Sequence, residues 1–335
     1  MKWLLGILAV LVLLVVALFT LPLYKEPPVD PAWAVAGSTN IPAGAVTVRF
    51  TSTATLLFSD GETDIMIDGW FSRPSEFELG FGEIEPDMEA ITFGLAANKV
   101  DTLDVVIPVH SHYDHAMDSP EVARRSGATL LGSESTANIG RGWGLPESKI
   151  QVFTDRVPVQ VGAFTITPIE SQHFQFPDPT MREQALGTPD ITEPLVPPAS
   201  AFDYRVGKAY VLHFAHPKGS FAITGSAGFI EGDLQGTQAD IVFLGVGGLG
   251  SQTDAYRETY WTESVATLDP HTVIPIHFDG LTAPITGPWR GPGLLMAMLS
   301  AGSDNTLAFL QAKAATAGAP TFKILPRYDE VVLFE

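Results

Sequence analysis

His110-Ser111-His112-Tyr113-Asp114-His115 directly follows residues 104–109, which are apolar after Asp104 and have the composition of a buried strand. Three imidazoles and one carboxylate fall within these six residues, in a chain of 335 residues with only eight histidines. Alternate side chains of an extended chain point to one side, so His110 and His112 can share one ion. A turn into the next helix can aim Asp114 and His115 at a neighbouring point. Zinc accepts such a mixture of nitrogen and oxygen ligands, so the pattern predicts a metal site.

Short β-like runs alternate with helical segments on both sides of this motif. Strands are predicted at residues 46–50, 53–58, 64–68, 104–109, 129–131, 151–153, 157–161, 164–170, 209–214, 221–224, 241–244, 273–276 and 331–334, and helices at 85–100, 119–127 and 256–268. Residues 174–198 carry six prolines and little periodicity, which predicts a functional loop or a disordered insert. Runs of strands in both halves, with helices between them, predict stacked sheets covered by helices in one domain over residues 46–335.

The N-terminus carries a continuous apolar run, residues 3–23, without a single charge. About 20 apolar residues suffice to cross a bilayer as a helix. We expect residues 1–24 to be a transmembrane anchor, with a cleaved signal peptide as the alternative, and residues 25–45 to be a linker. Lys2 favours a cytoplasmic N-terminus, which would place the catalytic domain outside the cytoplasm, in the periplasm or the extracellular space. Cleavage would give a secreted form.

The composition excludes several classes of protein. The formal net charge is −19, from 38 acidic and 19 basic residues, and a surface of this sign repels nucleic acid at long range. There is no cysteine, so thiol nucleophiles and cysteine-based metal sites are excluded. No Gly-x-Ser-x-Gly elbow and no Gly-x-x-x-x-Gly-Lys phosphate loop occurs. The sequence leaves the oligomeric state open.

The motif His-x-His-x-Asp-His resembles the signature of the metallo-β-lactamase-fold superfamily, and the likeness extends over roughly residues 46–335. Further landmarks match in order and spacing: Asp68 ends the opening strands, His173 follows residues 164–170, Gly225-Ser226 follows residues 221–224, and His277 follows residues 273–276. The His-Tyr-Asp-His variant and the Ile-Pro-Ile-His ending look most like the branch that contains UlaG-like lactonases and N-acyl-phosphatidylethanolamine phospholipase D.

The resemblance implies a four-layer αββα sandwich of the α/β (α+β) class with two divalent metals at one edge of the sheets. By position, the first metal would be held by His110, His112 and His173, and the second by Asp114, His115 and His277. Zinc is the favoured ion, with manganese or iron as alternatives. Asp68 would support the ligands from behind.

Ser226 departs from the family pattern, because a bridging aspartate usually stands at this position. A serine hydroxyl is neutral and bridges metals poorly. We therefore expect Ser226 outside the direct ligand set, a water or hydroxide as the bridge, and weaker binding of the second ion.

The resemblance also implies a function: hydrolysis of an ester-type bond, such as a phosphodiester or a lactone, by a metal-activated hydroxide, with Asp114 orienting the nucleophile or passing a proton. An exported β-lactam hydrolase and a non-catalytic metal-binding protein are the alternatives. An apolar rim beside a membrane anchor would suit a small-molecule or lipid-like substrate. The candidates for substrate contact are Trp70, Phe71, Tyr113, Phe174 and Trp289.

Overall fold

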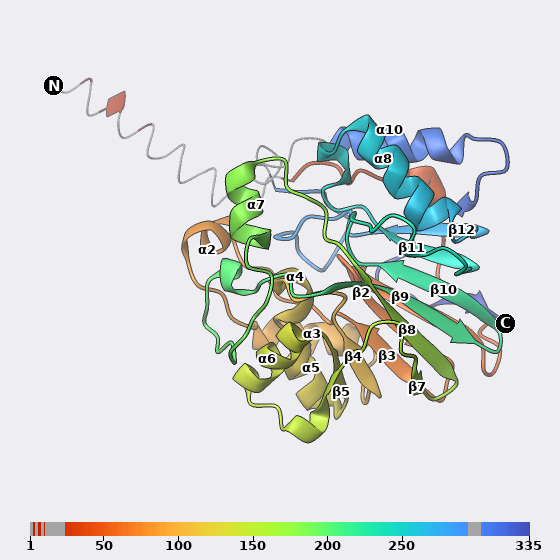
Figure 1. Cartoon of the computed structure of the whole chain (residues 1–335), viewed down its shortest axis with the longest axis horizontal. Helices are drawn as coiled ribbons and strands as arrows, with labels where there is room; N and C mark the ends of the chain where they lie inside the picture. The colour runs from red at the N-terminus through yellow and green to blue at the C-terminus, as the bar shows by residue number, and fades with distance from the viewer. Residues whose placement is uncertain (1–2, 4–5, 8–9, 11–23, 294–302) are drawn as a thin grey trace.

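The computed structural model of the chain describes residues 3, 6–7, 10, 24–293 and 303–335. Two seven-stranded mixed sheets form its centre (Figure 1). The first sheet has, in order, β14 (Val331–Phe334), β1 (Val46–Ser52), β2 (Thr55–Ser59), β3 (Asp64–Ile67), β4 (Val105–Ile107), β5 (Thr129–Gly132) and β6 (Ile150–Val152). The second has β13 (Thr321–Phe322), β12 (Thr272–Ile276), β11 (Ile241–Gly245), β10 (Gly219–Thr224), β9 (Ala209–His216), β8 (Phe164–Ser171) and β7 (Val159–Val161).

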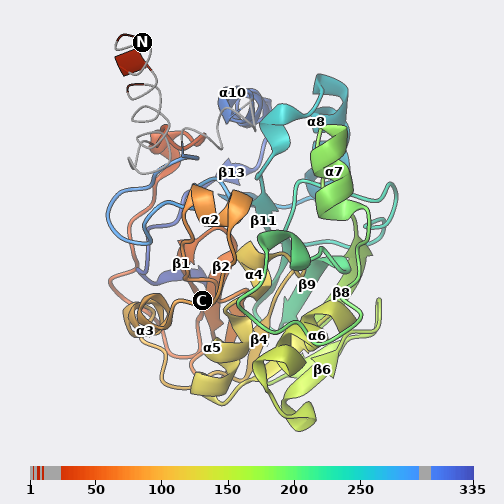
Figure 2. The same ribbon diagram turned by 90° about the vertical axis from the view of Figure 1, so that its left-hand side faces the viewer.

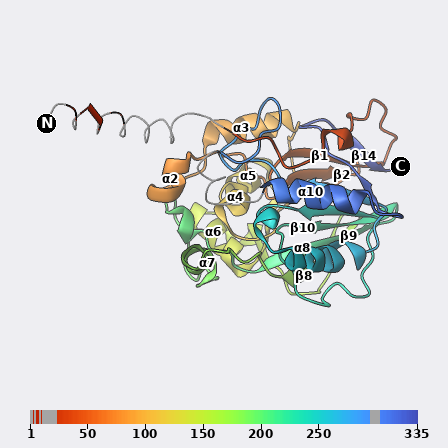
Figure 3. The ribbon, with the colours of Figure 1, turned by 90° about the horizontal axis from the view of Figure 1, so that it is seen from above.

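Helices cover the outer faces of both sheets. Figure 3 shows α3 and α8 on opposite sides of the strands. The helices on the side of the first sheet are α3 (Met88–Ala97), α5 (Ser119–Ser126) and α6 (Glu134–Trp143), and those on the side of the second are α8 (Asp254–Trp261), its π-helical continuation η5 (Thr262–Ala266) and α10 (Ser303–Ala314). This arrangement confirms the predicted sandwich of two sheets between helices.

Period-2 alternation in the strands explains the layers, because successive side chains of a strand point to opposite faces. In β2, Leu56 and Phe58 face the core between the sheets, whereas Leu57 faces the helices. Phe58 stacks on Phe221 of the opposite sheet, with ring centroids 4.4 Å apart. In β3, Met66 is the residue that faces the helices. Each strand thus joins two separate cores.

Three short helices lie at one end of the molecule, which faces the viewer in Figure 2: α2 (Glu76–Phe81), α4 (Tyr113–Ala116) and α7 (Pro179–Leu186). Helix α7 lies inside residues 174–198, where the sequence predicts a loop or disorder. That prediction is wrong for this stretch, because Asp178 caps the helix through Met181 N–H and Pro179 occupies its first turn. Single-turn 3₁₀ helices complete the fold: η1 (Pro31–Trp33), η2 (Glu147–Lys149), η3 (Ala201–Asp203) and η4 (Leu249–Ser251).

The predicted linker, residues 25–45, packs against the domain instead of hanging free of it. Val29 is buried, and the Trp33 ring lies 4.7 Å from the Phe322 ring. The backbone N–H of Val35 donates to the Ile324 carbonyl. The cause is the apolar side chains of the segment, which join the core between the sheets.

The transmembrane anchor predicted for residues 1–24 falls outside the described residues except for Trp3, Gly6, Ile7, Val10 and Tyr24. Within the described parts of the chain, no helix combines the length and the apolar character needed to span a membrane. The anchor therefore stays a prediction.

Candidate metal centre

The predicted ligands come from the ends of three strands. His110 and His112 lie in the loop after β4, and Asp114 and His115 lie on α4, which begins directly after His112. His173 follows β8, and His277 follows β12. The structure therefore brings together side chains from both sheets at one edge of the sandwich, as the resemblance implies.

His110, His112 and His173 form one cluster, whose ligand nitrogens lie within 4.8 Å of one another. Nε2 of His110 is 3.1 Å from Nδ1 of His112, so these two atoms face a common point. The His173 ring lies 5.0 Å from the His110 ring and 4.8 Å from the His112 ring, between centroids.

Asp114, His115 and His277 form the second cluster, by the same spacing of their ligand atoms. Oδ2 of Asp114 is 3.2 Å from Nε2 of His277 and 3.5 Å from Nε2 of His115. The two clusters adjoin, because the ring centroids of His110 and His115 are only 3.9 Å apart.

The outward-facing nitrogens of three ligands have acceptors, which leaves their other nitrogens for an ion. Nδ1 of His115 is 2.6 Å from Oδ2 of the fully buried Asp68. Nδ1 of His173 lies 2.9 Å from the Phe174 carbonyl, and Nε2 of His112 lies 3.5 Å from the Ala185 carbonyl on α7. Such outer hydrogen bonds select the tautomer and the ring orientation of a metal ligand. Asp68 thus lies behind His115, and its role in supporting a metal ligand stays a prediction.

Two features of the site suit divalent metal ions: a buried nitrogen without a hydrogen-bond partner, and the chemical types of the six candidate ligands. Nε2 of His115 is buried and has no hydrogen-bond partner among the described residues. A buried polar atom left unpaired costs about 1–3 kcal/mol, so an ion at this nitrogen would remove a real penalty. Six nitrogen and oxygen ligands in two groups of three suit two such ions.

Metal binding requires neutral imidazoles and ionised carboxylates, and burial and neighbouring charges favour these states at four of the six ligands. Burial lowers the pKa of His110 and His173 well below the ordinary value, and that of His112 to about 4. Burial alone would raise the pKa of Asp114, but His115 and His277 outweigh it and lower this pKa below its usual range. His115 is the exception: burial would lower its pKa, but Asp68 and Asp114 raise it above the ordinary value, so an ion at this imidazole would have to displace a proton.

Ser226 lies beside the first cluster. With His110, Thr224 and Gly225 it lines a cavity of about 10 Å³. Its hydroxyl accepts a hydrogen bond of 3.1 Å from the Phe174 N–H. The hydroxyl thus has a protein partner, and its exclusion from the metal ligands stays a prediction.

The residues predicted for substrate contact separate into two groups. Trp70 and Phe71 are completely buried in the two cores under the helices, so their placement at an open mouth is wrong. Trp289 is half-buried and packs against the core between the sheets, where its ring lies 5.1 Å from the Phe50 ring. The rings of Trp70 and Phe71 gain more by burial than they would at a rim.

Tyr113 and Phe174 remain near the ligands. Tyr113 begins α4 and is half-buried, with its ring edge-on to Trp70 at 6.0 Å. The Phe174 ring lies 4.4 Å from the His173 ring. The Ala185 carbonyl was not foreseen at the site, because a backbone acceptor leaves no signal in the sequence.

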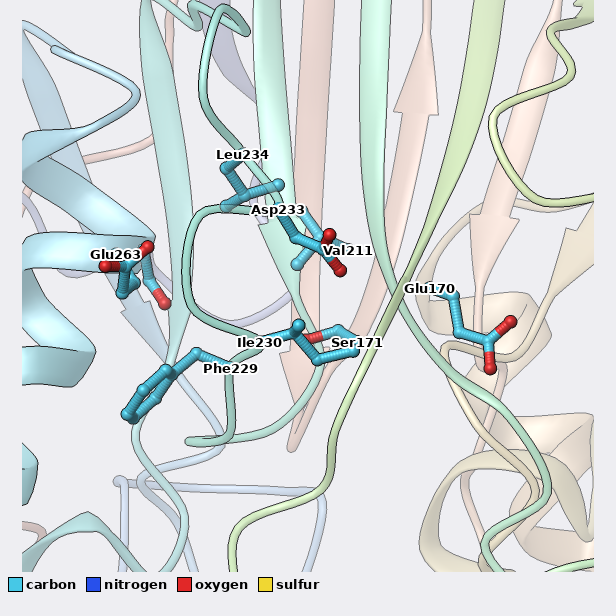
Figure 4. A pocket seen from close by; sticks show the side chains of 9 residues that line it. Glu170, Ser171, Val211, Phe229, Ile230, Asp233, Leu234 and Glu263 are labelled. Carbon is cyan, nitrogen blue, oxygen red and sulfur yellow. The ribbon is translucent and has the colours of Figure 1, made fainter.

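A second cavity of about 10 Å³ lies apart from the metal ligands (Figure 4). Three carboxylates line it, but none is arranged for an ion: Glu170 pairs with Lys208 at 2.6 Å, Asp233 pairs with Arg156, and Glu263 accepts from the Gly232 N–H. The two clusters at the sheet edge are the only such metal-binding groups among the described residues.

The fold and the site together define a class: an αββα sandwich with two adjoining His/Asp clusters at one sheet edge. A family model described as "Beta-lactamase superfamily domain" matches residues 47–277, and the chain belongs to the metallo-β-lactamase superfamily. Membership and the intact clusters indicate a metal-dependent hydrolase. The resemblance to the UlaG-like branch stays a prediction.

Two solved structures illustrate the likeness. Igni18, a novel metallo hydrolase from the hyperthermophilic archaeon Ignicoccus hospitalis KIN4/I, is 15% identical with a TM-score of 0.52, over 87% of this chain and 99% of that chain. A "possible metal-dependent hydrolase" from Veillonella parvula DSM 2008 is 12% identical with a TM-score of 0.52, over 87% of this chain and 100% of that chain. At such identities the likeness shows the fold alone. No curated protein matches the chain.

Proposed function

We propose that this protein hydrolyses an ester-type bond, such as a phosphodiester or a lactone, with two divalent ions held at the two clusters. Zn²⁺ is the favoured ion, because five of the six ligands are imidazoles. The observation that carries the proposal is the pairing of two adjoining three-ligand clusters, in which outer hydrogen bonds leave the inner nitrogens open.

Two bound ions would lower the pKa of a water and stabilise the negative charge that develops on the substrate oxygen. The protein side chains supply the rest. Asp114 is ionised at neutral pH, so its carboxylate can orient the attacking water by accepting a hydrogen bond from it. Asp68 holds His115 in one orientation through the 2.6 Å contact. Ser226 adds no charge to the site, so we expect a water, and not this side chain, to bridge the two ions.

The surroundings of His173 favour a substrate with an apolar part. The Phe176 ring stacks on the His173 ring, with centroids 5.6 Å apart. The Phe174 ring lies 4.4 Å from the His173 ring and 4.7 Å from the Phe176 ring. Helix α7 covers His112 through the Ala185 carbonyl. An apolar wall beside the ligands suits an acyl chain. Such a substrate would agree with our proposal that residues 1–24 anchor the enzyme in a membrane with its domain outside the cytoplasm.

The test is an activity panel on the full-length, Zn²⁺-loaded protein in detergent, with elemental analysis of the metal content. The panel contains short-chain and long-chain esters, lactones, phosphodiesters and the β-lactam nitrocefin. We expect turnover of at least one ester-type substrate, close to two metals per chain, and loss of turnover in His112→Ala with its thermal stability retained. Turnover of nitrocefin alone would establish the β-lactam alternative. No turnover of any substrate by the loaded protein would contradict the proposal.

A further inference from the structure

The ligand His277 has an unusual backbone. Its φ is 58°, in the left-handed region that residues other than glycine rarely adopt. Its N–H donates to the carbonyl of Thr53 at 2.6 Å. Thr53 lies between β1 and β2 and is itself left-handed, with a φ of 56°. A β-branched residue rarely adopts this conformation. Two strained residues from opposite sheets therefore meet through one hydrogen bond.

Asp279 holds the Thr53 side of this contact. Its side chain is buried, and Oδ1 accepts a 2.8 Å hydrogen bond from the Thr53 N–H. Oδ2 accepts a second hydrogen bond from the Ser52 hydroxyl. Arg73 in turn donates to the same hydroxyl. The strained Thr53 is thus bonded at its carbonyl by His277 and at its N–H by Asp279, two residues further along the chain.

The imidazole of His277 is confined on two further sides. A Cβ at Gly247 would come within 2.6 Å of Nδ1, so the backbone there forms a close wall behind the ring. On the opposite side Nε2 faces Oδ2 of Asp114 at 3.2 Å. With the ring so enclosed, a small shift of the His277 backbone would carry Nε2 out of the second cluster.

We propose that Asp279 is a positioning residue for His277: by clamping Ser52 and Thr53 it fixes the strained backbone that aims this imidazole at the second cluster. The role of Asp279 in holding the His277 backbone does not depend on a bound metal. Only the expected effect on metal binding rests on the proposed function. We attribute the left-handed conformations of Thr53 and His277 to the need to orient this imidazole.

The experiment compares the wild-type full chain with Asp279→Asn, in which the amide nitrogen cannot accept the Ser52 hydrogen bond while the size is kept. The first measurement is the ring resonances of ¹³C-labelled histidine in the metal-free protein. We expect the His277 signals to move and those of His173 and His213 to stay. Unmoved His277 signals in Asp279→Asn would overturn the proposal, whether or not the protein binds metal.

The second measurement is a Zn²⁺ titration against a chromophoric chelator. We expect one of the two equivalents to bind about 10–100-fold more weakly in the variant, as for other residues that orient a metal ligand, and the other to be unchanged. Equal weakening of both equivalents together with a lower melting temperature would reveal a merely structural role and overturn the proposal. Should wild-type protein bind no divalent ion, the proposed function fails, and the resonance measurement still decides the role of Asp279.

The control is Asp60→Asn, because Asp60 is also a buried aspartate that accepts backbone N–H groups, those of Glu62 and Thr63. It lies beside His216, which is not a ligand. We expect this variant to leave the His277 signals and both Zn²⁺ affinities unchanged. A Ser52→Ala variant removes one of the two clamping contacts and should give a smaller, parallel effect.

Discussion

Asp68→Asn tests whether the carboxylate behind His115 is needed for metal binding. Asp68 is fully buried and uses both oxygens: Oδ2 faces Nδ1 of His115 at 2.6 Å, and Oδ1 accepts from the Val109 N–H at 3.0 Å. An amide of the same size has only one oxygen. In one orientation its NH₂ group opposes the Val109 N–H, and in the other it opposes Nδ1–H of His115. The second case favours the tautomer that puts a proton on Nε2, the nitrogen intended for the ion.

The expected magnitude follows from these contacts. Loss of an outer hydrogen-bond partner typically weakens metal binding about 10–100-fold, which corresponds to about 1.4–2.7 kcal/mol. The metal-free protein should also lose about 1–3 kcal/mol of stability, because one buried donor is left without an acceptor. Competitive Zn²⁺ titration measures the first quantity, and urea unfolding of the metal-free protein measures the second.

Asp60→Asn serves again as the matched control, since its carboxylate lies close to His216, which is outside the site, at 3.4 Å. It should reduce stability without any change in Zn²⁺ affinity. If folded Asp68→Asn protein bound both Zn²⁺ equivalents as tightly as wild type, the reasoning about His115 would be refuted.

Two further predictions concern charge. Ser226→Asp adds a carboxylate beside His110, so the more weakly bound Zn²⁺ ion should bind about tenfold more tightly or better, which corresponds to about 1.4 kcal/mol. Unchanged affinity for that ion in a Zn²⁺ titration would count against the charge argument. Burial by itself raises the pKa of Glu121, but hydrogen bonds from Arg124, Arg125 and Trp143 lower it to about 2. Because the folded pKa lies below the unfolded one, this stabilisation is complete above about pH 5 and disappears as the pH falls towards 2. The melting temperatures of wild type and Glu121→Gln should therefore differ at neutral pH and converge in acid, and a pH-independent difference would show that the pairing is not the cause.

Local patterns predict much of this fold. The unbroken apolar run Leu56-Leu57-Phe58 is typical of a strand that is buried on both faces, and β2 contributes to the cores on both of its sides. Helix α7 shows the limit of the approach, since the prolines around it suggested a loop although Asp178 and Pro179 form a helix start. Residues 25–45 show another limit: their composition is that of a linker, but Trp33 finds a partner in Phe322 at the far end of the chain.

The sequence by itself determined the candidate metal ligands of this protein, because four of the six stand in one short motif after a strand and the other two follow strands at matching places. Only the tertiary structure decided how those ligands are held. Asp279 reaches Thr53 across 226 residues, and the Ala185 carbonyl reaches His112 across 73. Trp70 and Phe71 are also buried in the tertiary structure, although the sequence suggested them for substrate contact at the entrance of the site. The physical reason is that a motif records chemistry and local geometry, whereas burial and hydrogen-bond partners depend on which distant segments pack against it.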